Sequence, residues 1–215
     1  GLGNLYLVSN ELLTSGVVDS YTPPLPTPTV TQYLRESGAG GVSIAAGKTV
    51  NSYLGKLELE TRTGTGKTYS TPGDLTLGAA AVITDNSAST RPIEIYSNRD
   101  ILFGAGANLM QASNDDVFEF EAVRDITFGA GAYASFNEGI NTVAAGRDIN
   151  LAGGYLYQRR TNKSMLVTAG RNINLTSQGY MKVDGAGYLR ATATNNFYIG
   201  PQSYLRIITA GANVQ

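Results

Sequence analysis

The sequence of 215 residues contains no cysteine, no histidine and no tryptophan. Without thiols or imidazoles the chain has no disulfide, no thiolate or imidazole metal ligand and no Ser-His-Asp triad. Charge is also scarce, since charged residues make up 15% of the chain, against roughly 25% in an average soluble domain. We therefore expect a non-enzymatic protein with no cofactor and no metal site.

Neither sign of charge dominates the sequence. Sixteen basic residues face 17 acidic ones, for a net charge of −1. A chain so balanced has no overall field that would attract nucleic acid or an anionic membrane. No apolar run approaches the roughly 18 residues that a membrane-spanning helix needs. We predict no nucleic-acid partner and no membrane span.

Proline divides the chain into two parts. Four of the seven prolines fall in one short stretch, at Pro23, Pro24, Pro26 and Pro28. Each proline fixes its own φ and pushes the preceding residue into an extended conformation. We predict an extended N-terminal assembly arm over residues 1–40, ending in a helical turn near 31–36, and a second unit over 41–215. Such an arm could cap its own domain or clamp a neighbouring subunit.

From about Val42 onward the sequence repeats itself. The repeats align on an acidic or amide residue that usually follows arginine and precedes an alternating apolar stretch. The anchors are Asp74, Asp100, Asp125, Asp148, Asn172 and Asn196. Their spacings lie between 23 and 26 residues. A fixed period of this size predicts a solenoid.

Within each repeat the apolar residues alternate with polar ones, as in short β-strands. A finer beat of eight residues runs through Ile149, Tyr157, Met165, Ile173, Met181, Leu189, Phe197 and Leu205. Two residues later come Leu151, Arg159, Val167, Leu175, Val183, Ala191, Ile199 and Ile207. Since 24 is three times eight, we predict an all-β, three-sided parallel β-helix with about 24 residues per coil. Between Val42 and Ile207 it would have about seven coils.

The same pattern admits two ways of winding. If one chain winds around all three sides, a given corner recurs every 24 residues, whereas in three intertwined chains similarity recurs every eight. The Arg-Asp-Ile corner recurs at 24 and is absent from the intervening octads, which favours a single chain. The regular octads from Ile149 to Leu205 keep an intertwined trimer as the alternative.

Two of the corners carry a family resemblance. Residues 145–154 read Ala-Gly-Arg-Asp-Ile-Asn-Leu-Ala-Gly-Gly, and residues 169–175 read Ala-Gly-Arg-Asn-Ile-Asn-Leu. Both resemble the haemagglutinin repeat of filamentous-haemagglutinin-type secreted exoproteins. The resemblance implies a right-handed parallel β-helix at a bacterial cell surface, acting as an adhesin shaft or a toxin-delivery stick. The octads are also similar to the triple-stranded β-helices of phage and viral spikes and fibres.

In such a stack the anchoring aspartates form a column of like charge, which is destabilising unless something neutralises it. A second column lies beside it, formed by Arg99, Arg124, Arg147 and Arg171. We expect the arginines to compensate the aspartates. The change to Asn172 and Asn196 fits a ladder of stacked amides.

One segment combines aromatic rings with cations, as sugar- and protein-binding surfaces do. Its candidate contact residues are Tyr155, Tyr157, Arg159, Arg160 and Lys163. Arg159 falls at an inward octad position and interrupts the apolar column there. The alternative interpretation is a loop that bulges outward from the shaft.

A group of carboxylates is the one candidate for metal binding or glycosidase chemistry. It comprises Asp115, Asp116, Glu119 and Glu121. Parallel β-helices can host polysaccharide-cleaving enzymes, which use a pair of carboxylates. The alternation around Glu119 and Glu121 favours a solvated outer strand face instead.

These observations favour a structural or adhesive shaft or fibre subunit at a bacterial cell surface. We expect an extracellular protein that self-associates, as a filament, fibre or trimer, through its N-terminal arm and its coil ends. A glycan or a protein would be its receptor. The alternative is a spike, fibre or coat protein of a virion or phage tail, and a third hypothesis is a polysaccharide-cleaving β-helix enzyme.

Overall fold

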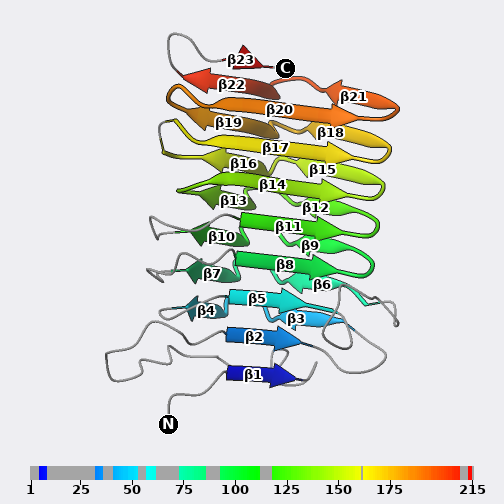
Figure 1. The fold of residues 1–215 in the computed structure, drawn as a ribbon. Coiled ribbons are helices and arrows are strands. Elements are labelled where there is room, and N and C mark those ends of the chain that lie inside the picture. The colour runs from blue at the N-terminus through cyan, green and yellow to red at the C-terminus, as the bar shows by residue number, and fades with distance from the viewer. Residues whose placement is uncertain are drawn as a thin grey trace.

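The chain winds into a rod of parallel β-strands with its termini at opposite ends (Figure 1). The computed structural model describes residues 5–8, 32–35, 41–52, 57–61, 73–85, 93–111, 118–160, 162–208 and 213–214. Among these residues there is no helix, and therefore none that is long and apolar enough to cross a bilayer.

The strands form three sheets, here named A, B and C. Sheet A contains β1 (Leu5–Val8), β2 (Gln32–Arg35), β5 (Leu57–Glu60), β8 (Ile93–Ser97), β11 (Phe118–Ala122), β14 (Ile140–Ala145), β17 (Ser164–Ala169), β20 (Tyr188–Ala193) and β23 (Asn213–Val214). Sheet B contains β3 (Val42–Ile44), β6 (Leu75–Leu77), β9 (Ile101–Phe103), β12 (Ile126–Phe128), β15 (Asp148–Ala152), β18 (Asn172–Thr176) and β21 (Asn196–Ile199). Sheet C contains β4 (Thr49–Ser52), β7 (Val82–Asp85), β10 (Asn108–Gln111), β13 (Tyr133–Phe136), β16 (Tyr155–Gln158), β19 (Tyr180–Asp184) and β22 (Tyr204–Ile208).

From β3 onward, each strand pairs in parallel with the third strand after it along the chain. Ile149 in β15 lies opposite Ile173 in β18, 24 residues later, and Ile173 lies opposite Phe197 in β21. The three-sided parallel β-helix is therefore confirmed, and the seven strands of sheets B and C agree with about seven coils. All of this pairing joins strands of one chain, so the winding is that of a single chain.

The core is a set of vertical apolar columns inside the coil. Strands such as β12 and β15 alternate buried and half-buried residues, because successive side chains point to opposite faces. The rings of Phe103 and Phe128 stack at 4.4 Å between centroids in neighbouring coils. In-register stacking therefore places like side chains on one another and removes them from water together.

The octad pattern is wrong at one strand, β16. Leu156 and Gln158 are the fully buried residues there, whereas Tyr157 and Arg159 are only half-buried. Because side chains alternate along a strand, a shift of one residue exchanges its two faces. The predicted inward positions of Tyr157 and Arg159 are thus corrected to Leu156 and Gln158.

The physical reason for this shift is a short corner. From Leu151 to Tyr155 the chain advances four residues, but the equivalent advance from Leu175 to Tyr180 takes five. The following corner is one residue longer, so Met165 and Leu189 again pair at a separation of 24. The two changes cancel, and the period alone does not reveal them.

The octad pattern also differs from the structure at the C-terminal end. Phe197 and Ile199 occupy predicted inward positions, yet they are 37% and 46% exposed. Within the described residues no strand of sheet B lies beyond β21, so nothing there covers these side chains. Their exposure comes from their place in the last coil and not from a change of strand face.

At the N-terminal end two strands come from the predicted arm. β1 pairs with β2, and β2 pairs with β5, so both extend sheet A. The helical turn predicted near 31–36 is wrong, because Gln32–Arg35 forms β2 on the edge that β5 offers. The proline strap lies outside the described residues. The division into 1–40 and 41–215 stays a prediction.

Candidate functional site

The corner between sheets A and B carries the predicted Asp and Arg columns. Each arginine pairs with the aspartate of the preceding coil. Arg99 contacts Asp74 through Nε and Nη2, at 2.6 and 2.5 Å, and Arg147 contacts Asp125 at 3.1 and 2.5 Å. The remaining pairs are Arg124 with Asp100 and Arg171 with Asp148. We call these eight residues the Asp–Arg ladder.

The aspartates of this ladder also bind the backbone. The amide of Asp125 donates to Oδ1 of Asp100 at 3.0 Å, and the amide of Asp148 donates to Asp125 at 3.1 Å. In the same manner the amide of Asn172 donates to Asp148 at 3.1 Å. The carboxylates thus satisfy main-chain donors where the chain turns into sheet B, in addition to pairing with arginine.

The amides continue the column toward the C-terminus. Asn172 Nδ2 donates to Asp148 Oδ1 at 2.8 Å, and Asn196 Nδ2 donates to Asn172 Oδ1 at 3.1 Å. Hydrogen bonding to Arg99 lowers the pKa of Asp74, and hydrogen bonding to Arg171 lowers that of Asp148. All of these contacts lie inside the ladder, which gives it a structural role.

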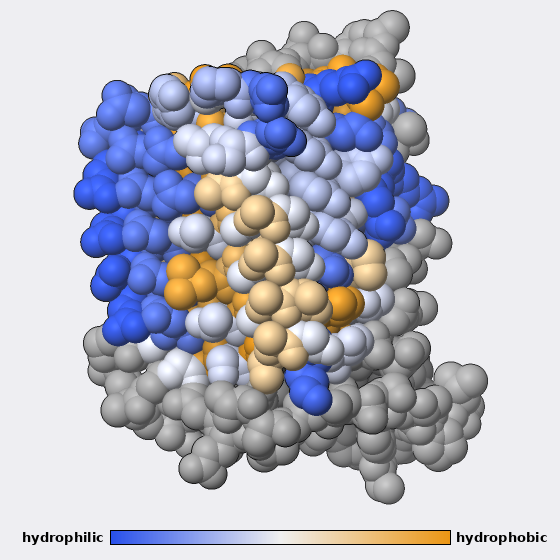
Figure 2. Space-filling model, turned by 180° about the vertical axis from the view of Figure 1, so that it is seen from behind, coloured by the Kyte–Doolittle hydropathy of each residue, from blue (hydrophilic) through white to orange (hydrophobic). Residues whose placement is uncertain are grey.

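The glycine before each arginine of the resembling motif has its own steric reason. A Cβ on Gly146 would lie 2.1 Å from the carbonyl oxygen of Val123, and one on Gly170 would lie 2.2 Å from that of Gly146. Coils approach too closely here for any side chain. In Figure 2 this corner is the hydrophilic edge at the left.

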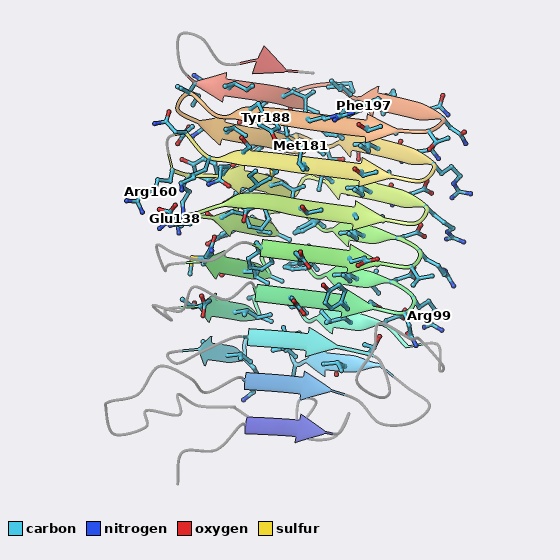
Figure 3. The ribbon with its side chains drawn as sticks, in the orientation of Figure 1. Arg99, Glu138, Arg160, Met181, Tyr188 and Phe197 are labelled. Carbon is cyan, nitrogen blue, oxygen red and sulfur yellow. The ribbon has the colours of Figure 1, made fainter. Side chains whose placement is uncertain are left out.

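The cations of the predicted contact segment lie at the opposite corner, between sheets C and A. Arg160 pairs with Glu138, and Lys163 Nζ lies 2.6 Å from the other oxygen of that carboxylate. Glu138 is buried, and Figure 3 shows it beside Arg160, on the far edge from Arg99. Arg159 donates to the backbone carbonyl of Gln111. The three cations are therefore held by internal contacts.

The two tyrosines of that segment lie apart from its cations, on the outer face of sheet C. Tyr157 donates its hydroxyl to Asp184, and Lys182 Nζ lies 4.2 Å from the centre of its ring. Tyr155 instead belongs to a stack of four rings. The structure thus divides the predicted contact segment between a strand face and a corner.

The stack of four rings is a feature that our sequence reasoning missed. We call it the tyrosine ladder, and its members are Tyr133, Tyr155, Tyr180 and Tyr204. Successive ring centroids are 4.8, 4.5 and 4.8 Å apart, with 6° between ring planes. The signal was available, because each tyrosine is the first residue of a sheet C strand.

An open hollow lies beside the C-terminal half of the tyrosine ladder. Its volume is about 360 Å³, and it is lined by Gln178, Tyr180, Gln202 and Tyr204. Gln178 Nε2 donates to Gln202 Oε1 at 3.0 Å. Burial raises the pKa of the Tyr180 hydroxyl, so at neutral pH the group remains a neutral donor. This hollow is the candidate binding site of the described chain.

The candidate carboxylates do not assemble in the described structure. Asp115 and Asp116 lie outside the described residues. Glu119 accepts a hydrogen bond from the buried hydroxyl of Tyr96 at 2.7 Å, and Glu121 lies opposite Tyr96 in the adjacent strand. In the described part of the chain, no group of three or more acidic side chains is arranged to hold a metal ion.

Comparison with known proteins identifies no relative. No family model, curated protein or solved structure matches the chain. The resemblance of residues 145–154 and 169–175 to haemagglutinin repeats therefore stays a prediction, and what the chain does has to be argued from its own geometry.

Proposed function

We propose that this chain is a structural and adhesive shaft at a bacterial cell surface, with no catalytic role. The observation that carries the proposal is the unbroken stacking of sheets B and C from β3 and β4 to β21 and β22. Backbone hydrogen bonds between coils run along the rod, so a pull or a bend along the axis acts on many of them together. Such a shaft holds a binding surface away from the body that carries it.

The interior supports the same role. The buried columns are apolar along most of the rod, and every coil contacts its immediate neighbours, as in other solenoids. The charges at the corner between sheets A and B are paired with one another, so they do not repel successive coils. A rod built this way can be lengthened by repetition without a larger core.

Self-association is part of the proposal, and the last described coil supports it. Phe197, Tyr198 and Ile199 are 37%, 51% and 46% exposed on β21. An apolar coil end of this kind is a surface that proteins normally cover. The same feature favours the second candidate, a fibre or spike of a virion, whose subunits join at their ends.

The test combines imaging with labelling of intact cells. Negative-stain images of the purified chain should show unbranched rods, and antibodies against it should label the source cells without permeabilisation. Compact particles, or labelling that requires permeabilisation, would contradict a surface shaft. Labelling of purified virions in place of cells would decide for the second candidate.

A further inference from the structure

The corner that leads into sheet C changes its residue type along the rod. In every coil the residue two positions before the sheet C strand has a left-handed backbone. It is glycine in four coils, at Gly47, Gly106, Gly131 and Gly153, and alanine at Ala80. In the last two coils it is glutamine, with φ of 72° at Gln178 and 60° at Gln202.

Glutamine is a costly choice at such a position. A residue with a side chain disfavours the left-handed region, which glycine adopts freely. Strain of this kind is retained where the surroundings or a function require it. Both side chains are exposed, and they border the hollow beside the tyrosine ladder. The residue type that costs stability therefore occurs where the chain has its candidate binding site.

The two glutamine amides present polar atoms to the hollow. Their mutual hydrogen bond uses Nε2 of Gln178 and Oε1 of Gln202. Among the described residues, Oε1 of Gln178 and Nε2 of Gln202 then have no hydrogen-bond partner. An acceptor and a donor held side by side suit the adjacent hydroxyl groups of a sugar.

The tyrosines supply the apolar part of the hollow. Tyr180 and Tyr204 stack at 4.8 Å, so they present ring edges to the hollow. In the described chain no ring of the ladder lies beyond Tyr204, which is 40% exposed. One face of Tyr204 is thus open to the apolar C–H face of a sugar ring.

The charges nearby favour a neutral ligand. The four lining residues are uncharged. Lys182, which lies next to the ladder on β19, is engaged by Asp184 at 3.2 Å and by the ring of Tyr157. Arg206, on β22, is exposed but does not line the hollow. The hollow itself therefore offers a sugar amides and aromatic rings, with no charge.

We propose that the hollow binds a neutral, extended β-linked glycan that lies along the rod axis. Each step of the tyrosine ladder is comparable to the length of one sugar ring in such a chain, so successive sugars can follow successive tyrosines. The inference deepens the proposed adhesive function and rests on it, because it names the receptor class of that shaft.

The test measures binding of cello-oligosaccharides of increasing length to the whole chain by isothermal titration calorimetry. Affinity should rise with oligomer length. The double substitution Gln178→Gly and Gln202→Gly should weaken binding by about tenfold or more, as the loss of two hydrogen bonds predicts. Because glycine suits the left-handed backbone, the variant should fold and its melting temperature should not fall.

Two matched controls accompany this variant. Ala80→Gly makes the same type of backbone change in a coil far from the hollow and should leave affinity unchanged. Tyr204→Ala should weaken binding, whereas Tyr198→Ala removes an exposed tyrosine of sheet B and should not. Circular dichroism of each variant verifies the fold.

Three outcomes would overturn the glycan proposal. They are no binding of cello-oligosaccharides, binding that the glutamine substitutions leave unchanged, and binding of acidic oligogalacturonates alone. None of these results changes the shape of the particle or its labelling on cells, so a failure of the glycan proposal is distinguishable from a failure of the shaft.

Discussion

At the residue scale, close approach between coils decides which side chains the corners accept. Gly170 lies so near the backbone of the preceding coil that even a methyl group would overlap a carbonyl oxygen. Gly131 has open space around it, but its φ of 68° is one that other residues rarely adopt. The two glycines are therefore needed for different reasons, and the penalties for replacing them should differ.

We predict that Gly170→Ala lowers the free energy of unfolding by about 2 kcal/mol or more, because the overlap involves backbone that cannot move away cheaply. Gly131→Ala should cost only about 1 kcal/mol, the penalty for a left-handed alanine. Urea denaturation followed by circular dichroism measures both values. Equal losses would show that contact with the preceding coil is not the reason for Gly170.

The Asp–Arg ladder makes stability depend on pH. Arg171 lowers the pKa of Asp148 in the folded chain relative to the unfolded chain. A lowered carboxyl pKa contributes stability that is present above the unfolded pKa, about 4, and is lost as pH falls through the folded value. The melting temperature of the wild type should exceed that of Arg171→Gln at pH 7, and the difference should vanish near pH 2.

The measurement is a series of thermal melts of both proteins between pH 7 and pH 2. Arg190→Gln is the matched control, since Arg190 is exposed on β20 and lies outside the Asp–Arg ladder. Its difference from the wild type should not follow the same course with pH. A difference between the wild type and Arg171→Gln that persists at pH 2 would contradict the role of the carboxylate.

At the scale of a single strand, β16 shows how a corner decides which residues enter the core. The short corner before β16 turns Gln158 inward, where its Nε2 donates to the carbonyl of Asn137 at 3.2 Å. Asn141 donates to Gln158 Oε1 and accepts a hydrogen bond from the amide of Phe118 at 3.0 Å. The buried amides thus satisfy each other and the nearby backbone.

We predict that Gln158→Leu lowers the free energy of unfolding by about 1–3 kcal/mol, because it leaves buried polar partners without their hydrogen bonds. Met181→Leu, an apolar exchange of similar volume in the next coil, should cost less than about 1.5 kcal/mol. Chemical denaturation compares the two variants. A stabilised Gln158→Leu variant would mean that the polar pair is not needed at this corner.

At the scale of the whole molecule, the rod is a stack in which protection depends on neighbours. Central strands such as β15 have a coil on each side, while β21 is exposed along its length. We predict that amide hydrogen exchange is slowest in β12, β15 and β18 and fastest in β21 and β22, since local opening begins where contacts are fewest. Mass spectrometry of peptic fragments measures this gradient, and uniform protection would contradict it.

The sequence by itself determined the three-sided coil, because residues 24 positions apart become vertical neighbours and each strand repeats the pattern of the strand below it. Only the tertiary structure decided the face of β16, the tyrosine ladder and the pairing of Gln178 with Gln202. Corner lengths vary by one residue, so side chains that meet on an outer face do not share one spacing in the sequence. Alternation records which residues are buried, whereas contacts on the outside depend on how each corner sets the next strand.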